Sequence, residues 1–234
     1  MKSVFTAQNR IIAFLTFMVF IVVPDGMIQA QQKIGFGIHF DSGISWLTSN
    51  IKETRNDGLR SGFNFGLTFN RYFSRNYSFS TGISLLNGGG RLSNTDTTMI
   101  ELSKSPQTIL PAGEEVIYNI RYLSFPVGLK LQTNQVGYTT FFSDLGLDPK
   151  IVLGGTADIP SLNLKDENAD SELNNFNLSY HITIGIEYSL GGTTALLLAL
   201  NYDNNFLDIT RDNGDQPGDN VSHKILSLRI GVNF

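Results

Sequence analysis

The 234-residue sequence contains no cysteine, which excludes a disulfide framework, a thiolate metal site and a cysteine nucleophile. Charged residues make up only 16% of the chain and the formal net charge is -4, so we expect no basic surface and no nucleic-acid partner. Histidine occurs only at His39, His181 and His223. The sequence therefore offers few candidates for catalytic or metal chemistry.

Long apolar runs are also scarce, and the one near the N-terminus, Ile11 to Val23, is too short for a membrane-spanning helix, which needs about 20 residues. Lys2 and Arg10 precede this run, and small and polar residues follow it. The pattern is typical of a secretory signal peptide over residues 1–30, with an uncleaved anchor as the alternative. Residues 31–234 are then the mature chain and are expected to form one domain.

From Ile34 onward, apolar and polar residues alternate with a period of two, which indicates β-strands whose two faces meet different environments. The last segment shows this most clearly, because Leu226, Leu228 and Ile230 fall on one face and Ser227 and Arg229 on the other. We count eight such segments. They are residues 34–46, 59–73, 77–85, 116–132, 138–153, 176–190, 195–203 and 224–234.

Two of these segments are irregular. In 116–132 the apolar parity changes after Tyr122, which predicts a β-bulge near that residue. In 138–153, Pro149 is expected to mark a bend.

The connections between the segments alternate in length. Short turns follow the second, fourth and sixth segments, and long polar loops run through Thr48–Asp57, Ser93–Glu115, Asp158–Asn174 and Asp208–Asn220. An even number of antiparallel strands with short turns at one end and long loops at the other is typical of bacterial outer-membrane barrels. The sequence thus predicts an all-β fold, an eight-stranded antiparallel up-and-down transmembrane β-barrel in the outer membrane, with both termini in the periplasm.

Alternation alone does not decide which face lies inside, because a soluble lipocalin-type barrel has the same period with its apolar face inward. The polar face favours a membrane barrel, since it is mostly Gly, Ser, Thr, Asn and Ala rather than Lys and Glu. Aromatic residues at both ends of the apolar face predict girdles at the two bilayer interfaces. They are Trp46, Tyr118, Phe176 and Tyr202 on the loop side, and Phe73, Tyr77, Tyr188 and Phe234 on the turn side.

The segment Arg121-Tyr-Leu-Ser-Phe-Pro-Val-Gly-Leu-Lys-Leu131 resembles the PorT-like outer-membrane β-barrel family of the Bacteroidota. Members of that family often carry Tyr-Leu, two further residues, then Pro and an apolar run, and commonly have an acidic residue where Ser124 stands. The strands with Gly66 and Gly82 and the segment Asp144-Leu-Gly-Leu147 also fit, so the resemblance covers most of the mature chain. It implies an eight-stranded barrel, and the name-giving member takes part in type IX secretion.

The polar face carries the remaining candidates for chemistry. His39 and His181 are predicted to point into the lumen, either as a metal-ligand pair or catalytic base or, more simply, as hydrogen-bonded lumen residues. Charges of both signs are predicted to pair with one another there, the alternative being a gated ion path through an interior that eight strands leave filled with side chains. These charged residues are Asp41, Arg60, Lys130, Asp144, Glu187, Asp203 and Arg229.

Two glycine-containing segments resemble ligand loops only superficially. Arg211–Asn220 lacks the terminal Glu and the spacing of an EF-hand, so we interpret it as a solvated acidic loop. Gly88-Gly89-Gly90 opens no helix and lacks a lysine, so we interpret it as relief of strain near the barrel rim rather than a phosphate loop. No catalytic, cofactor-binding or metal site and no cofactor are predicted.

We therefore expect a non-enzymatic outer-membrane barrel with a structural or interaction role in the cell envelope. The alternatives are an accessory component of type IX, PorT-like protein secretion and a narrow channel. Expected partners are outer-membrane lipid, the barrel assembly machinery through the C-terminal strand that ends at Phe234, and an envelope or secretion protein.

Overall fold

The computed structural model describes residues 34–100, 102, 108–211 and 218–234, so the predicted signal peptide lies outside the described residues, as does most of the acidic loop 211–220. Two short 3-10 helices are present, η1 (Pro160–Leu162) and η2 (Asp170–Glu172). The strands are β1 (Ile34–Ser49), β2 (Thr54–Gly58), β3 (Arg60–Ser74), β4 (Tyr77–Asn94), β5 (Thr98–Ile100), β6 (Thr108–Leu110), β7 (Glu115–Ser124), β8 (Val127–Gln132), β9 (Thr139–Ile159), β10 (Leu164–Asn168), β11 (Phe176–Gly191), β12 (Thr194–Asn205) and β13 (Val221–Asn233).

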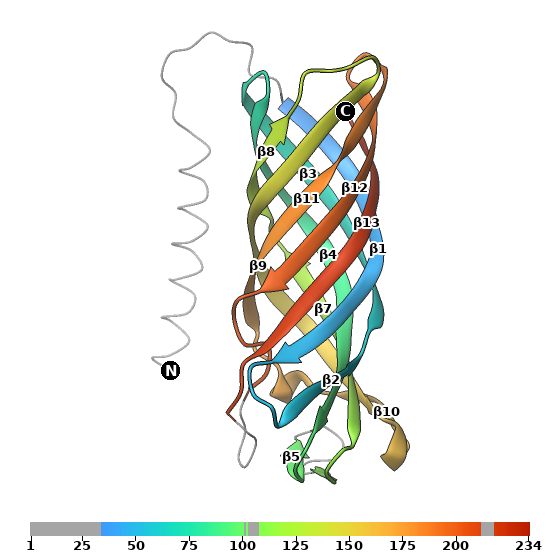
Figure 1. The fold of residues 1–234 in the computed structure, drawn as a ribbon, viewed down its shortest axis with the longest axis vertical. Coiled ribbons are helices and arrows are strands. Elements are labelled where there is room, and N and C mark those ends of the chain that lie inside the picture. The colour runs from blue at the N-terminus through green and yellow to red at the C-terminus, as the bar shows by residue number, and fades with distance from the viewer. Residues whose placement is uncertain (1–33, 101, 103–107, 212–217) are drawn as a thin grey trace. The chain divides into compact units, whose positions relative to one another are not determined.

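The long strands close into a ring in which every neighbouring pair is antiparallel (Figure 1). The order around the ring is β1, β3, β4, β7 followed by β8, β9, β11, β12 and β13. The last strand returns to β1 through pairs that run from Gly37–Asn233 to Ser49–Val221. Because β7 and β8 together form one strand of the ring, the predicted eight-stranded up-and-down barrel is confirmed.

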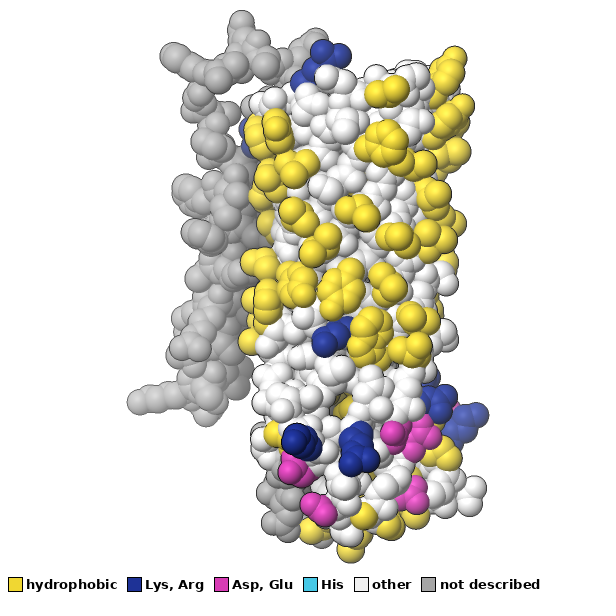
Figure 2. Space-filling view, in the orientation of Figure 1, with side chains coloured by type: hydrophobic (Ala, Val, Ile, Leu, Met, Phe, Trp, Pro, Cys, Tyr) yellow, Lys and Arg dark blue, Asp and Glu magenta, His cyan; other side chains and the backbone are white. Residues whose placement is uncertain are grey.

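Side chains alternate between the outside and the inside of this barrel. On β13, Leu228 is 48% exposed and Ile230 is 52% exposed, whereas Ser227 between Leu226 and Leu228 is 6% exposed. Figure 2 shows apolar side chains spread over the barrel wall, with most of the charged side chains in that view gathered at the end that carries the long loops. The exterior is apolar and the interior largely polar, which is the reverse of a soluble barrel.

The two ends of the barrel differ as the connections predict. Short turns join β3 to β4, β8 to β9 and β11 to β12 at one end, where Phe234 and Phe36 exchange backbone hydrogen bonds of 2.7 and 3.2 Å. At the other end the long connections are partly regular rather than plain loops. They contain β2 and β10, which extend the barrel strands, the β5–β6 hairpin, and both 3-10 helices.

The predicted bulge near Tyr122 is wrong. Tyr122, Ser124 and Lys130 are all buried, so the chain keeps one parity from β7 into β8, and β4 pairs with both strands in one continuous register. The apolar parity changes in the sequence because the interior itself turns from apolar to polar along this strand. A bulge does occur opposite Tyr122, but it lies in β9, where Leu153 is left without a partner.

Two prolines lie on the paired strands where β7 passes into β8, with Pro126 opposite Asp148 and Pro149 opposite Phe125. Pro126 has no N–H to donate, which interrupts the ladder of backbone hydrogen bonds there without shifting its register. Across the ladder, Phe125 donates its N–H to the carbonyl of Pro149 at 2.9 Å. Pro149, which we expected to mark a bend, lies inside the continuous strand β9 and is paired with Leu178.

The glycine triplet is likewise part of a strand. Gly88, Gly89 and Gly90 are buried within β4, which continues well past the predicted end at Leu85. A Cβ on Gly90 would lie 2.6 Å from the backbone nitrogen of Leu47, so only glycine allows this close approach.

Between the polar lumen and the long loops, the interior of the barrel is filled by apolar side chains. Tyr118, which we expected in the outer aromatic girdle, belongs to this cluster and is only 6% exposed. The cluster joins strand residues to residues of the long connections. Its buried members are Leu47, Leu86, Leu92, Ile100, Leu102, Leu110, Val116, Tyr118, Ile120, Tyr122, Ala157, Ile159, Ala169, Leu173, Ile209, Val221 and Ile225, which we call the loop-end core.

The other predicted girdle residues do lie on the outside. On the turn side, Phe73 stacks on Tyr77 with ring centroids 6.3 Å apart. On the loop side, Tyr180 contacts Tyr202 and Phe206 with centroids 6.2 and 5.2 Å apart. Among the described residues, no helix has the length and hydropathy needed to cross a membrane.

Candidate functional site: the charged lumen

The first group of lumen charges joins β1 to β13. Asp41 and Arg229 are direct cross-strand partners, and Arg229 Nε and Nη2 donate to Asp41 Oδ1 and Oδ2 at 2.8 and 2.9 Å. Asn64 Nδ2 donates to Asp41 Oδ2 at 3.0 Å, and His39 Nδ1 lies 3.0 Å from Oδ1. Asp41 is only 1% exposed, so this forked guanidinium pair supplies the opposite charge that its burial requires.

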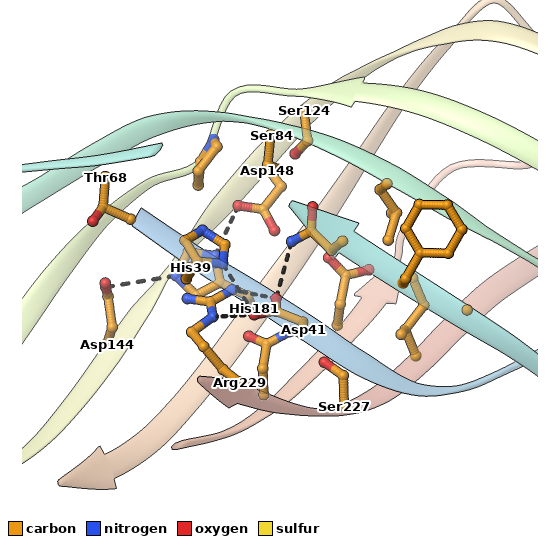
Figure 3. A pocket seen from close by; sticks show the side chains of 18 of the residues that line it. His39, Asp41, Thr68, Ser84, Ser124, Asp144, Asp148, His181, Ser227 and Arg229 are labelled. Atoms are coloured by element: carbon orange, nitrogen blue, oxygen red, sulfur yellow. Dashed lines mark hydrogen bonds and ion pairs between the residues drawn. The ribbon is translucent and has the colours of Figure 1, made fainter. Parts of the chain in front are cut away.

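The second group joins β9 to β11 and lies beside the first (Figure 3). His181 is held between two carboxylates, with Nδ1 2.8 Å from Asp148 Oδ1 and Nε2 3.5 Å from Asp144 Oδ1. The two aspartates are four residues apart on β9, so they share one face of the strand, and this face lines the lumen.

The third group crosses the lumen from β9 to β12, passing over β11. Lys150 Nζ donates to both carboxylate oxygens of Asp203 at 2.7 and 2.8 Å, and Ser179 Oγ donates to Asp203 Oδ2 at 2.9 Å. Lys150 is 1% exposed, which makes this one of the most deeply buried ion pairs in the described barrel.

A fourth group lies toward the turn end. Lys130 forms an ion pair with Glu187, and its Nζ lies 4.8 Å from the centre of the Phe142 ring. Gln132 and Asn233 also donate to Glu187, at 2.9 and 2.6 Å. Most of the charged residues predicted to lie in the lumen therefore form pairs there. They are Asp41, Lys130, Asp144, Glu187, Asp203 and Arg229.

The remaining predictions fare differently. Arg60 is half-buried at the loop end of β3 and joins none of the ion pairs found among the described residues. Lys150 was missed, although it continues the inward parity of Asp144 and Asp148 past Pro149. His223, which we did not place in the lumen, is fully buried and stacks on Tyr122 in the loop-end core with ring centroids 5.7 Å apart.

The first three groups surround a cavity of about 670 Å³ of space free of atoms, part of it open to solvent. Among the described residues, the side-chain partners of His39 and His181 are aspartates rather than serine hydroxyls, so neither histidine forms a Ser–His pair there. Within the same residues, no group of three His, Asp or Glu side chains is placed to hold a metal ion. The arrangement can hold fixed charges and hydrogen-bond a small polar guest.

Comparison with known proteins gives a family match over most of the chain. The family described as the outer membrane protein beta-barrel domain matches residues 29–211. No curated protein matches this chain.

Solved structures of outer-membrane proteins show a weak likeness to this chain, at low sequence identity. Neisserial surface protein A is 12% identical, covers 85% of this chain and 97% of its own, and has a TM-score of 0.45. OprG from Pseudomonas aeruginosa is 14% identical with coverage of 89% and 99% and a TM-score of 0.43. The outer membrane protease OmpT from Escherichia coli is 8% identical with coverage of 90% and 99% and a TM-score of 0.43. At these identities and TM-scores the likeness carries no activity over to this chain.

Proposed function

The chain belongs to the outer membrane protein beta-barrel domain family, and from this membership we propose that it is a non-enzymatic barrel with an interaction role in the cell envelope. One observation carries the proposal. The long connections fold back on the barrel and contribute Ile100, Leu110, Leu173 and Ile209 to the loop-end core. A loop end built around its own buried core presents a defined surface outside the membrane, which suits recognition of another envelope component.

The lumen supports the same proposal. Its charges are mostly paired with one another, and the loop-end core fills the interior between them and the long loops. A narrow channel is the less favoured alternative, because an ion crossing this barrel would have to pass Leu47, Ile120 and Tyr122, all 1% exposed or less. Single-channel recording on the purified protein tests that alternative, and stable conductance steps would favour it.

The β5–β6 hairpin has one strongly exposed apolar residue and offers a place to test the interaction role. Ile109 on β6 is 62% exposed, whereas Leu200 on β12 is 52% exposed on the lipid-facing wall. A photo-crosslinking amino acid at position 109 is expected to capture a specific envelope protein in intact cells, and the same probe at position 200 serves as the control. Equal products at the two positions, or none at 109, would count against a loop-end partner.

A second candidate function is an accessory role in type IX secretion. It rests on the resemblance of the segment Arg121–Leu131 to the PorT-like family. Its Pro126 stands at the passage from β7 to β8. For a secretion accessory, we expect contacts from the turn end, where Arg75 is exposed. Crosslinks from position 75 to secretion components, with cargo retained in a deletion strain, would favour this role over the first.

Both roles require the same location and orientation in the outer membrane. We propose that residues 1–30 are removed as a signal peptide and that both termini of the mature chain lie in the periplasm. Phe234 at the turn end, next to Phe36, supports a common side for the two ends. Mass spectrometry of the outer-membrane protein tests the cleavage, and recovery of peptides from residues 1–30 would contradict it.

A further inference from the structure

Three serine hydroxyls in the lumen are not used by the protein. Ser84 on β4, Ser124 on β7 and Ser227 on β13 are 6%, 4% and 6% exposed, and all three line the central cavity (Figure 3). No hydrogen bond joins them to another residue in the part of the chain that the structure describes. Their oxygens therefore face the cavity itself, where water or a small polar guest supplies the hydrogen bonds that the protein does not.

The charge around the same cavity is unbalanced. Four carboxylates line it, from Asp41, Asp144, Asp148 and Asp203, against the two fixed cations of Lys150 and Arg229. His39 and His181 line the cavity as well. With His181 protonated between its two aspartates and His39 neutral, three cations face four carboxylates. Buried charges need compensation, so a positively charged guest is favoured over a neutral or negative one.

The unused hydrogen-bonding capacity also favours a guest that donates. Asn64 Oδ1 accepts no hydrogen bond, and Asp144 Oδ1 accepts none either, although it lies 3.5 Å from His181 Nε2. Both residues line the cavity with the three serines, whose oxygens can accept as well. Acceptors from β3, β4, β7, β9 and β13 therefore line one cavity.

We propose that this cavity binds a small primary ammonium group, as an ammonium ion or a short primary amine. Such a group brings one positive charge and three N–H donors in a small volume, which matches the excess carboxylate and the unused acceptors. A quaternary ammonium carries the charge without donors, and a phosphate or carboxylate would be repelled. This binding site goes beyond the interaction role and does not depend on it.

The test uses the full mature protein, folded in detergent micelles, with methylammonium chloride as the probe. The temperature of the heat-induced mobility shift is measured against probe concentration at constant ionic strength, with tetramethylammonium chloride and sodium chloride as references. We expect a saturable rise with methylammonium and no saturable rise with either reference. An equal effect of tetramethylammonium or sodium would overturn the proposal. Ammonium chloride in place of methylammonium distinguishes the bare ion from an amine.

A matched pair of variants locates the site. Ser124→Val removes one cavity hydroxyl and should weaken methylammonium binding about tenfold, whereas Ser42→Val, on the exposed face of β1, should leave it unchanged. Unchanged affinity in folded Ser124→Val would overturn the site. A nuclear Overhauser contact between methylammonium and Ser124 in the unmodified protein is a test independent of variant folding, and failure to find it at saturation would also overturn the proposal.

Discussion

Replacing Lys150 by methionine tests whether the lumen is a packed, low-dielectric interior. The substitution keeps the length of the side chain but removes the charge, so Asp203 loses both of its bonds to Lys150 and retains the one from Ser179 at 2.9 Å. Removing one partner of a buried ion pair typically costs about 3 to 5 kcal/mol, because the other charge is left uncompensated. Since Lys150 is 1% exposed, we expect the Lys150→Met variant to fall in that range.

The double variant Lys150→Met, Asp203→Leu separates this cause from simple loss of contacts. With both charges gone, the penalty should fall to within about 1 to 2 kcal/mol of the unmodified protein, because a hydrophobic pair of similar volume commonly replaces a buried ion pair without loss. Reversible urea unfolding in lipid vesicles measures each free energy, and Lys52→Met in an exposed loop is the control. A cost below about 1 kcal/mol for Lys150→Met would mean a solvated lumen, as in a channel, and would refute the reasoning.

Three further substitutions test other parts of the barrel. Leu228→Arg, at a lipid-facing position of β13, should cost about 2 to 4 kcal/mol in vesicle unfolding experiments, and a cost near zero would mean that this face meets water. Tyr122→Phe should leave the unfolding free energy unchanged or slightly raise it, because the buried Tyr122 hydroxyl has no partner, and a loss above about 1 kcal/mol would show that it has one. Deletion of Phe234 removes two backbone hydrogen bonds to Phe36 and one girdle residue, so membrane assembly in cells should fall, and unchanged heat-shifted mobility would contradict this.

Much of the barrel can be predicted from the sequence because lipid imposes a strict rule on it. Most outward residues in the membrane are apolar and most inward residues are small or polar, so the period of two marks the strands of β1, β11 and β13 almost to their ends. The rule fails where the barrel leaves the membrane. In β7, Tyr118 and Ile120 point inward to the loop-end core, and their apolar parity imitates a bulge that the strand does not have.

The individual lumen charges are also predictable, but their pairing is not. Parity alone places Asp41 and Arg229 inside, and they happen to be direct neighbours on paired strands. Lys150 and Asp203 instead meet across an intervening strand, at a distance set by the curvature of the closed barrel. The sequence contains no local signal for such a contact, nor for the cavity that the ion pairs surround.

The most direct test of the account is to label single cysteines on the two faces of the wall. At Ile184, Leu198 and Leu228 we expect reaction with a lipid-soluble maleimide and resistance to a charged one in intact outer membranes, because these side chains are 45% to 55% exposed on the apolar exterior. At Ser84 and Ser227, 6% exposed, we expect reaction with neither reagent. Reaction of the charged maleimide at the two serine positions, with all three apolar positions protected from both reagents, would contradict the account. It would mean a barrel whose apolar face points inward and whose polar face meets water.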